Sequence, residues 1–204
     1  MIDTTSCFLH IIGKIITEPQ MAVINGKNVY VVELSIERIS GTKDTVTAEI
    51  PEKLFCSTQE YKNKYAEIEG ELRTYRYDDG DKRRLKVYVL AKNITLSDDM
   101  TETPVNDIKL TGYVCNKSQI RRTPLGRTVI DFTVAVNRIE GRADYIPCIA
   151  WSKNAEHVEN LSIGDKVKIE GRIQSREYVK KYDTYTERRT VNELSVSRIS
   201  GGVM

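Results

Sequence analysis

The sequence predicts an all-β protein in which one small barrel, with five short strands and one short helix, occurs twice. Three observations support this prediction. Several segments recur at an offset that drifts from 99 to 101 residues, so the chain is an internal duplication. Within each copy, apolar residues alternate with polar ones at a period of two, which is typical of half-buried strands. No segment shows the alternation of strands with long helices that a parallel α/β sheet requires.

A short polar segment marks the boundary between the two copies. Residues 97–107 carry four acidic side chains, no basic one and Pro104, which is typical of a linker. The sequence therefore predicts a first unit at 1–96, an acidic linker at 97–107 and a second unit at 108–204. The recurring segments are Ile11–Ile15 with Leu110–Val114, Gly26–Val29 with Gly126–Val129, Arg38–Gly41 with Arg138–Gly141, and Ile68–Leu72 with Ile169–Ile173.

The elements of the second unit follow the order strand, strand, strand, helix, strand, strand. They are strands near 110–114, 130–136 and 145–151, a short helix near 153–161, and strands at 167–179 and 190–196. The first unit repeats this pattern, with an alternating strand at 30–36 and a last strand at 85–90. This order is that of the OB-fold, a partly open, five-stranded Greek-key barrel. The sequence therefore predicts two tandem OB-folds.

The charge of the chain is distributed unevenly between the units. The formal net charge is +2, but residues 1–96 are neutral, 97–107 carry −4 and 108–204 carry +6. A cationic second unit indicates a polyanionic partner there. No apolar stretch approaches the roughly 18 residues of a membrane span, and the N-terminus lacks the pattern of a secretory signal. The four cysteines lie far apart, which indicates buried thiols in a cytoplasmic protein rather than disulfides.

The outward face of the second unit combines cations with an aromatic ring. In the strand at 167–179, alternation turns Val167, Ile169, Ile173 and Val179 towards the core. The remaining residues of this strand and its end then face outward. This outward set is Lys168, Glu170, Arg172, Gln174, Arg176, Tyr178 and Lys180.

Single-stranded nucleic acid requires this combination of side chains. Its phosphates attract Lys and Arg, and each unpaired base can stack on an aromatic ring for roughly 1–3 kcal/mol, whatever its sequence. Tyr145 and Trp151 share a face of the third strand and add two rings. The predicted binding residues of the second unit are Tyr145, Trp151, Tyr178, Arg121, Arg122, Arg127, Arg138, Lys153, Arg172, Arg176, Lys180, Lys181, Tyr182, Tyr185, Arg188 and Arg189. The alternative is an ordinary solvated sheet face with Trp151 in the core.

The corresponding face of the first unit is more acidic. Thr45 and Pro51 stand where the second unit has Tyr145 and Trp151, and carboxylates repel phosphate. We therefore expect the second unit to hold the strand, and the first to contribute less and to extend the path or build an oligomer. The outward glutamates are Glu33, Glu37, Glu67, Glu69 and Glu71. The secondary binding residues that the first unit retains are Arg73, Tyr75, Tyr77, Lys82, Arg83 and Arg84.

The second unit resembles the core of bacterial single-stranded DNA-binding proteins. The resemblance rests on the segments Tyr145–Ala155 and Ile163–Tyr178, and it covers most of the unit. In that family, three aromatic residues at matching positions stack on bases. They correspond here to Tyr145, Trp151 and Tyr178. The weaker first copy resembles the tandem-OB members of the family.

The resemblance implies a non-catalytic protein that coats and protects single-stranded DNA in replication, recombination or repair. The same chemistry suits RNA. It also implies a cytoplasmic, nucleoid-associated homodimer, because four OB units commonly assemble in that family. Two departures stand out. The loop at 137–141 has no aromatic residue, and the end of the chain at 200–204 is not the acidic tail that recruits repair enzymes in that family, which argues against such recruitment.

Enzymatic function is not predicted. The chain has none of the common phosphate-binding or nucleophile motifs, and its two histidines, His10 and His157, lie at non-corresponding places. No spacing suits a metal, so neither cofactor nor metal is expected. Asp78–Asp81 indicates a hairpin turn rather than a calcium loop. The remaining alternative is an OB-fold scaffold for protein or structured RNA, such as a primosome-type accessory factor, which would lack a salt-dependent affinity for unstructured oligonucleotides.

Overall fold

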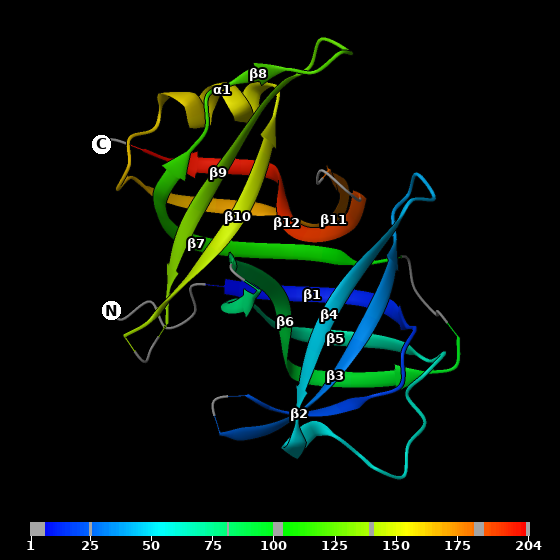
Figure 1. Cartoon of the computed structure of the whole chain (residues 1–204). Coiled ribbons are helices and arrows are strands. Elements are labelled where there is room, and N and C mark those ends of the chain that lie inside the picture. Colours follow the sequence, from blue (N-terminus) through cyan, green and yellow to red (C-terminus); the bar gives the residue numbers. More distant parts are fainter. Residues whose placement is uncertain are drawn as a thin grey trace.

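The protein folds into two barrels that share one continuous sheet, as Figure 1 shows. The structure is a computed structural model that describes residues 7–24, 26–80, 82–99, 104–138, 141–181 and 186–202. The strands of the first unit are β1 (Cys7–Ile15), β2 (Gln20–Ile24), β3 (Lys27–Glu37), β4 (Lys43–Pro51), β5 (Tyr65–Asp79) and β6 (Lys82–Ser97). The strands of the second unit are β7 (Asn106–Lys117), β8 (Arg121–Arg122), β9 (Thr128–Asn137), β10 (Ala143–Trp151), β11 (Lys166–Lys181) and β12 (Thr186–Gly201).

The strand order confirms the two predicted OB-folds. The sheet runs β2-β3-β4-β6-β5-β1-β7-β11-β12-β10-β9-β8, and the pairings β3–β1 and β7–β9 close each unit into a barrel. The pairs β4–β6 and β10–β12 are parallel, and the other pairs are antiparallel. Each unit also has a short strand, β2 or β8, that pairs with the strand after it. This strand adds to the five predicted from the sequence.

The two units differ in the connection that follows their third long strand. In the second unit, α1 (Lys153–Asn160) covers the barrel with two buried apolar residues. In the first unit, only a 3-10 helix at Glu52–Leu54 stands there. An aromatic stack accompanies it: the ring of Phe55 lies 3.5 Å from that of Tyr30 and 4.8 Å from that of Tyr61, between centroids. Stacked rings therefore fill in the first unit part of the space that a helix covers in the second.

The core follows the alternation read from the sequence, except where a strand leaves the barrel. The buried apolar residues of β9 and β10 include Ile130, Phe132, Val134, Val136, Ile146, Cys148 and Ala150. The inward prediction for Val179 is wrong, because this side chain is 55 % exposed. Gln174, expected to face outward, is buried, and its amide donates a 2.9 Å hydrogen bond to Glu193. After Gln174, β11 leaves the barrel, so its side chains no longer cover a core.

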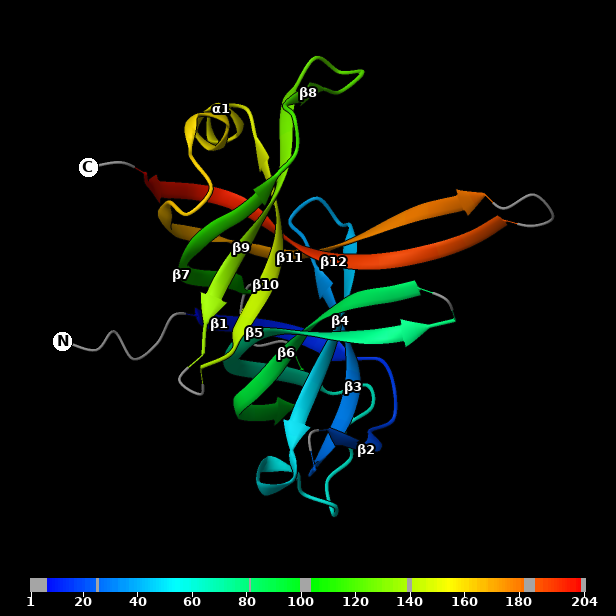
Figure 2. The same cartoon turned by 60° about the vertical axis from the view of Figure 1, so that its left-hand side comes forward.

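Two long hairpins project from the barrels. We call residues 75–79 with 82–86, at the end of β5 and the start of β6, the first arm. The second arm is residues 176–181 with 186–191, at the end of β11 and the start of β12. Figure 2 shows both arms reaching out on the same side of the molecule. The hairpin turn predicted at Asp78–Asp81 is confirmed at the tip of the first arm: β5 ends at Asp79, which pairs with Lys82, and Gly80 has a φ of 61°. Asp81 lies outside the described residues.

The two units are related by an approximate two-fold axis at the pairing of β1 with β7. Leu9 pairs with Ile108, which is its own equivalent in the second copy, and both are fully buried. Antiparallel strands that pair through equivalent residues place equivalent groups symmetrically on either side. The tandem chain therefore has the architecture of a two-fold dimer of OB-folds within one polypeptide.

A pair of mirrored polar contacts fixes the units to each other. Asp44 accepts a 2.7 Å hydrogen bond from the backbone N–H of Ser175, and Asp144 accepts one of 2.6 Å from the backbone N–H of Thr74. The arginine six residues before each aspartate donates from Nε at 2.6 Å. Both carboxylates are buried, so these hydrogen bonds satisfy groups that would otherwise be costly to bury.

Gly70 and Gly171 explain why one short motif recurs in both copies. Each follows a glutamate at a bulge, where the register of β5 with β6, or of β11 with β12, shifts. A Cβ at Gly70 would lie 2.2 Å from the carbonyl oxygen of Leu90, and one at Gly171 would lie 2.3 Å from that of Ser195. Only glycine permits this approach of two backbones.

The segment between the units is short. β6 ends at Ser97 and β7 begins at Asn106, so the last residues of the predicted acidic linker belong to β7.

Of the four cysteines, Cys7 and Cys148 are buried as expected, whereas Cys56 is exposed. Among the described residues, no helix has the length and apolarity that crossing a membrane requires.

Candidate nucleic-acid interface

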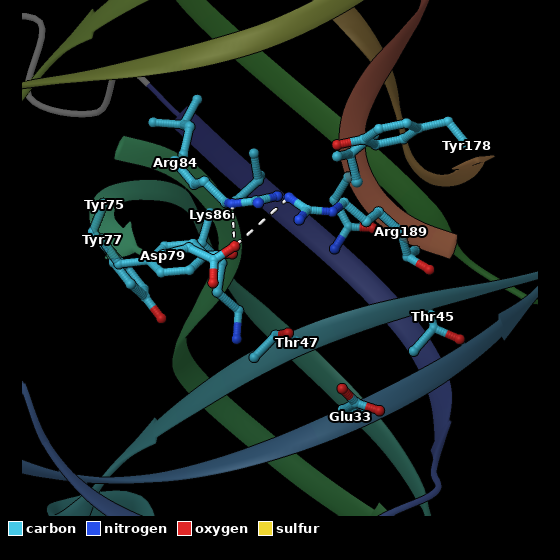
Figure 3. Close-up of a pocket in the computed structure, with 15 residues that line it drawn as sticks. Glu33, Thr45, Thr47, Tyr75, Tyr77, Asp79, Arg84, Lys86, Tyr178 and Arg189 are labelled. Atoms are coloured by element: carbon cyan, nitrogen blue, oxygen red, sulfur yellow. Dashed lines mark ion pairs between the residues drawn. The ribbon is translucent and has the colours of Figure 1, made fainter. Parts of the chain in front are cut away.

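A groove with a volume of about 820 Å³ lies between the two arms, and Figure 3 shows it in close-up. Its walls are the arms, and its floor is formed by β3 and β4 of the first unit. Both units therefore contribute to one surface. The lining residues are Glu33, Thr45, Thr47, Tyr75, Tyr77, Asp79, Arg84, Leu85, Lys86, Val87, Tyr178, Arg189, Thr190, Val191 and Asn192.

Strand alternation places the rings and cations of each arm on its groove side. In the first arm, Tyr75 pairs with Lys86, and Tyr77 pairs with Arg84. Residues that pair across an antiparallel ladder share a face, as do residues two apart along a strand. Tyr75, Tyr77, Arg84 and Lys86 therefore line one face. In the second arm, the pair Tyr178 and Arg189 does the same.

Three tyrosine rings are the main aromatic surface of the groove. Tyr77 and Tyr178 are 42 % and 38 % exposed, so a ring face of each is open to a ligand. Tyr75 is half-buried between Tyr77 and Tyr88, at centroid distances of 6.2 and 5.4 Å. Burial and then the charge of Glu49 raise the pKa of Tyr75 above its ordinary value. The ring is therefore a neutral phenol at physiological pH, which suits stacking on a base.

The groove also carries both signs of charge. Arg84, Lys86 and Arg189 are cationic, and Asp79 and Glu33 are acidic. Asp79 Oδ2 lies 2.5 Å from Nε of Arg84 and 3.7 Å from Nη1 of Arg189. The two guanidinium groups are recessed, since their side chains are only 19 % and 12 % exposed. A polyanion that enters the groove meets more positive than negative groups.

A buried carboxyl, Glu49, lies beside the groove on β4. Its residue is 3 % exposed. Burial, opposed in part by the charge of Lys86, raises its pKa to about 7. Burial, and then the charge of Glu49, raise the pKa of Tyr88 to about 12. The charge on this side of the groove therefore changes near neutral pH.

Tyr145 and Trp151 lie at opposite ends of β10 in the second unit. Tyr145 is 43 % exposed, and the guanidinium of Arg76 from the first unit's arm lies over its ring at 6.0 Å. Trp151 is half-buried, six residues further along the strand. At about 3.3 Å per residue, the two are separated by roughly 20 Å. Neither is among the residues that line the groove with Tyr178.

Several predicted cations are exposed outside the groove. Arg121, Arg122 and Arg127 lie on and beside the β8–β9 hairpin, and Arg121 pairs with Asp131 at 2.8 Å. Lys153 is exposed at the start of α1. The others are in or near the arms: Arg172, Arg176 and Arg188 are exposed in the second unit, and Lys82 and Arg83 in the first. Arg176 pairs with the buried Glu193 at 3.4 Å.

Two predicted cations, Arg73 and Arg138, lie at the contact between the units. Arg138 binds Asp144 through two nitrogens and donates a 3.0 Å hydrogen bond to the carbonyl of Thr74. Arg73 donates to the same aspartate at 3.0 Å and pairs with Glu71. Burial disfavours ionisation of Asp144, but its hydrogen bonds from Arg138, Thr74 and Arg73 outweigh this and lower its pKa. These two arginines hold the units together.

The remaining predictions lie outside the described part of the chain. They are the side chains of Lys180 and Lys181 and the whole of Tyr182 and Tyr185. Among the described residues, no cluster of three or more His, Cys, Asp or Glu side chains is arranged to hold a metal ion.

The structure adds residues that the sequence argument omitted, chiefly Asp79 and Lys86. A signal for both exists in the sequence. Asp79 has the same strand parity as Tyr75 and Tyr77, and Lys86 has that of Arg84. The floor residues Thr45 and Thr47 had no such signal, because only the fold brings the arms over β4.

Comparison with known proteins finds a family model that matches the second unit. Residues 105–200 match the family described as "Single-strand binding protein family". The single-stranded DNA-binding protein of Halalkalibacterium halodurans is 41 % identical over 81 residues, covering 36 % of this chain and 48 % of that protein. Single-stranded DNA-binding protein A of Bacillus subtilis is 38 % identical over 81 residues, covering 36 % of this chain and 47 % of that protein. The chain thus spans about half the length of these curated relatives.

The structural comparison extends the likeness to the first unit. The wild-type single-stranded DNA binding protein from Thermus aquaticus superposes with a TM-score of 0.70 at 20 % identity, covering 97 % of this chain and 93 % of that chain. This likeness concerns the fold, and it includes both barrels.

Proposed function

We propose that this chain, whose residues 105–200 match the model of the single-strand binding protein family, binds single-stranded DNA without sequence preference and without catalysis. In this role it would coat and protect the strand in replication, recombination or repair. The observation that carries the proposal is the groove between the arms. It presents Tyr75, Tyr77 and Tyr178, with cations from both units, to one open space.

The chemistry of the groove suits unpaired polynucleotide. Each base–aromatic stack contributes roughly 1–3 kcal/mol and is tolerant of sequence. Arg84, Lys86 and Arg189 contribute charge-assisted contacts to phosphates. Bases in a duplex are stacked on each other and expose no face to such rings. The groove therefore favours single strands over duplex.

We propose a path that continues from the groove onto the second unit. Arg76 connects the back of the first arm with Tyr145, and β10 leads from there to Trp151. Exposed cations of the second unit flank this track. Arg73 and Arg138 are not part of the proposed path, because both are bound to Asp144 at the contact between the units.

In this proposal, the binding site is not confined to the second unit. Most of the groove's lining comes from the first unit, whose arm carries two of the three tyrosines. We propose that the units at 1–96 and 108–204 bind one strand jointly. A fragment of either unit would then keep only part of the affinity.

Fluorescence titration tests the proposed function directly. Trp151 is the only tryptophan, so its emission should be quenched when oligo-dT saturates the protein. The logarithm of the binding constant should fall linearly with the logarithm of salt concentration. A band-shift series with single-stranded DNA, RNA and duplex compares the ligands. Absence of any salt-dependent binding to single-stranded DNA would refute the proposal.

A substitution at Tyr178 tests the stacking role. Tyr178→Ala should weaken oligo-dT binding by roughly 1–3 kcal/mol, which is about 5- to 150-fold. Tyr178→Phe is the matched control, because it keeps the ring and should bind within about twofold of the parent. Equal affinities of the Ala and Phe variants would show that the ring does not stack.

We also propose that two chains form a homodimer with four OB-folds. The outer face of the central sheet supports this. Glu67 and Glu69 of the first unit lie on one half of it, and Lys168 and Arg198 of the second unit lie on the other. A two-fold axis along β1 and β7 would bring the acidic half of one chain onto the basic half of the other.

Light scattering after size exclusion tests the dimer. The expected mass is twice the 23.3 kDa of the chain, and Lys168→Glu should lower it at low salt by opposing like charges. A mass of one chain at all protein concentrations would refute the dimer without affecting the DNA-binding proposal.

A further inference from the structure

One carboxylate connects the two arms across the groove. Asp79, the last residue of β5, lies 2.5 Å from Nε of Arg84 in its own arm. It also lies 3.7 Å from Nη1 of Arg189 in the other arm, as the dashed lines in Figure 3 show. Asp79 itself is 47 % exposed, whereas the arginine side chains are recessed. A solvent-accessible acid therefore covers two less accessible guanidinium groups.

Asp79 contacts both guanidinium groups at once. Two guanidinium groups share one carboxylate, and the buried Nε of Arg84 makes no hydrogen bond among the described residues, close as it is to Asp79. Arginine is well suited to phosphate, because its planar array of donors matches two phosphate oxygens. An oxyanion placed between the arms could therefore engage both arginines, as the Asp79 carboxylate does now.

The neighbouring rings put this position on the course of a bound strand. Tyr77 pairs with Arg84, and Tyr178 pairs with Arg189. A base stacked on either ring has its phosphate within reach of the adjoining arginine. The position between the two arginines is thus where the backbone would cross from one arm to the other.

We propose that Arg84 and Arg189 form a site for one phosphodiester of the bound strand, and that Asp79 occupies this site in the free protein until the strand displaces it. The inference rests on the proposed function of the groove and assigns a regulatory role to an acidic residue within it. Asp79 keeps the arms together while the groove is empty, and it competes with the phosphate.

This arrangement has a consequence for salt dependence. A cation that binds a phosphate ordinarily releases a counterion, which contributes about −0.7 per phosphate to the slope of log K against log salt for single strands. The strand still releases its counterion when Asp79 is displaced, but the displaced carboxylate then attracts a cation from solution, which offsets that release at this position. The parent protein should therefore have a shallower slope than a variant that has no carboxylate at position 79 to displace.

The test compares Asp79→Asn with the full-length parent in oligo-dT titrations at several salt concentrations. Asp79→Asn should bind roughly three- to tenfold more tightly at low salt, with a slope steeper by up to about 0.7. Asp78→Asn is the matched control. It makes the same charge change one residue earlier, on the opposite face of the strand, and should leave the slope unchanged.

Other outcomes overturn the inference. If Asp79→Asn binds no more tightly than the parent, or both Asn variants act alike, Asp79 does not occupy a phosphate site. Asp79→Ala guards against hydrogen bonds made by the new amide and should give the same gain. Arg189→Gln should weaken binding and reduce the effect of Asp79→Asn, because Asp79 then competes with the phosphate for Arg84 alone. If the parent does not bind oligo-dT at all, the proposed function fails and not this inference alone.

Discussion

In each unit, an aspartate of the strand that precedes the helical connection reaches across to the other barrel. Asp44 and Asp144 accept backbone hydrogen bonds of 2.7 and 2.6 Å from the opposite unit. Each is also held by an arginine six residues earlier. The contact at Asp144 has one more cation than the contact at Asp44, because Arg73 of the first unit also donates to Asp144. The residue of the second unit that is equivalent to Arg73 is Gln174, which is uncharged.

The residues on the other face of the same two strands have diverged. Thr45 and Tyr145 are equivalent, and each follows its aspartate directly. The buried Glu49 of the first unit corresponds to Ile149 of the second, which is equally buried. The contact between the barrels therefore constrains one face of these strands in both copies. The other face is free to specialise for a ligand.

The largest expected effect concerns the duplicated contact. Asp144→Ala should lower the free energy of unfolding by about 3–5 kcal/mol, because it removes the buried acceptor shared by Arg138, Arg73 and the backbone N–H of Thr74. Asp44→Ala should cost at least about 1.5 kcal/mol less, because only one arginine loses its partner. Urea unfolding measures both. Asp78→Ala is the control, and at this exposed site the stability should stay within about 0.5 kcal/mol of the parent's. Equal losses of stability in Asp144→Ala and Asp44→Ala would show that the two contacts contribute equally.

The second prediction concerns Glu49 and pH. Its pKa in the folded protein, about 7, is above the ordinary 4.5, so the folded state binds the proton more tightly than the unfolded state. Stability contributed by the protonated carboxyl is complete below pH 4.5 and is lost as the pH rises to about 7, by about 3 kcal/mol at most. Glu49→Gln should therefore gain stability relative to the parent across this window.

The measurement is urea unfolding of parent and Glu49→Gln at a series of pH values. Titration of the other groups cancels in the difference between the two proteins. A difference that does not change with pH would show that Glu49 ionises normally in the fold.

A third prediction exchanges the diverged residues. Tyr145→Thr gives the second unit the residue of the first and should weaken oligo-dT binding by roughly 1–3 kcal/mol, the value of one stacked base. Thermal unfolding should change little, because Tyr145 is 43 % exposed. Unaltered affinity in the titration would remove Tyr145 from the proposed path and confine the strand to the groove.

The smallest expected effect is on the stability of the fold and concerns β1 and β7, the strands through which the two units pair. Asn106 exchanges hydrogen bonds of 2.8 and 2.9 Å with the backbone of Ile173, whereas the equivalent Cys7 accepts only one, of 3.3 Å, from Leu72. Asn106→Cys should cost about 0.5–1.5 kcal/mol of stability, the net value of one hydrogen bond. A stability equal to the parent's, measured by urea unfolding, would mean that the two positions are interchangeable.

The sequence was sufficient to predict the duplication, the OB-folds and the groove's rings. Repeats and alternation are local signals, so the order of elements and the pairing of residues such as Tyr178 with cations follow from them. The inward prediction for Val179 failed because alternation does not show where a strand leaves its barrel. No pattern in the sequence indicates that Arg138 pairs with Asp144 of its own unit and donates a hydrogen bond to Thr74 of the other unit.

The groove itself depends on the tertiary structure. Tyr77 and Tyr178 are separated by about half the chain, and they meet only because β1 pairs with β7 and aligns the arms. Judged by the sequence, the outward face of the first unit is acidic. In the structure, however, Glu71 pairs with Arg73 and Lys92, and Glu67 pairs with His10. These carboxylates therefore repel a polyanion less than their number suggests.

The most direct test of the shared groove is photo-crosslinking of the full chain to a short oligo-dT that carries 5-bromouracil, followed by mass spectrometry of the labelled peptides. We predict that one oligonucleotide labels both arms, at Tyr75 or Tyr77 in the first and at Tyr178 in the second. Labels confined to peptides of one unit would contradict the account.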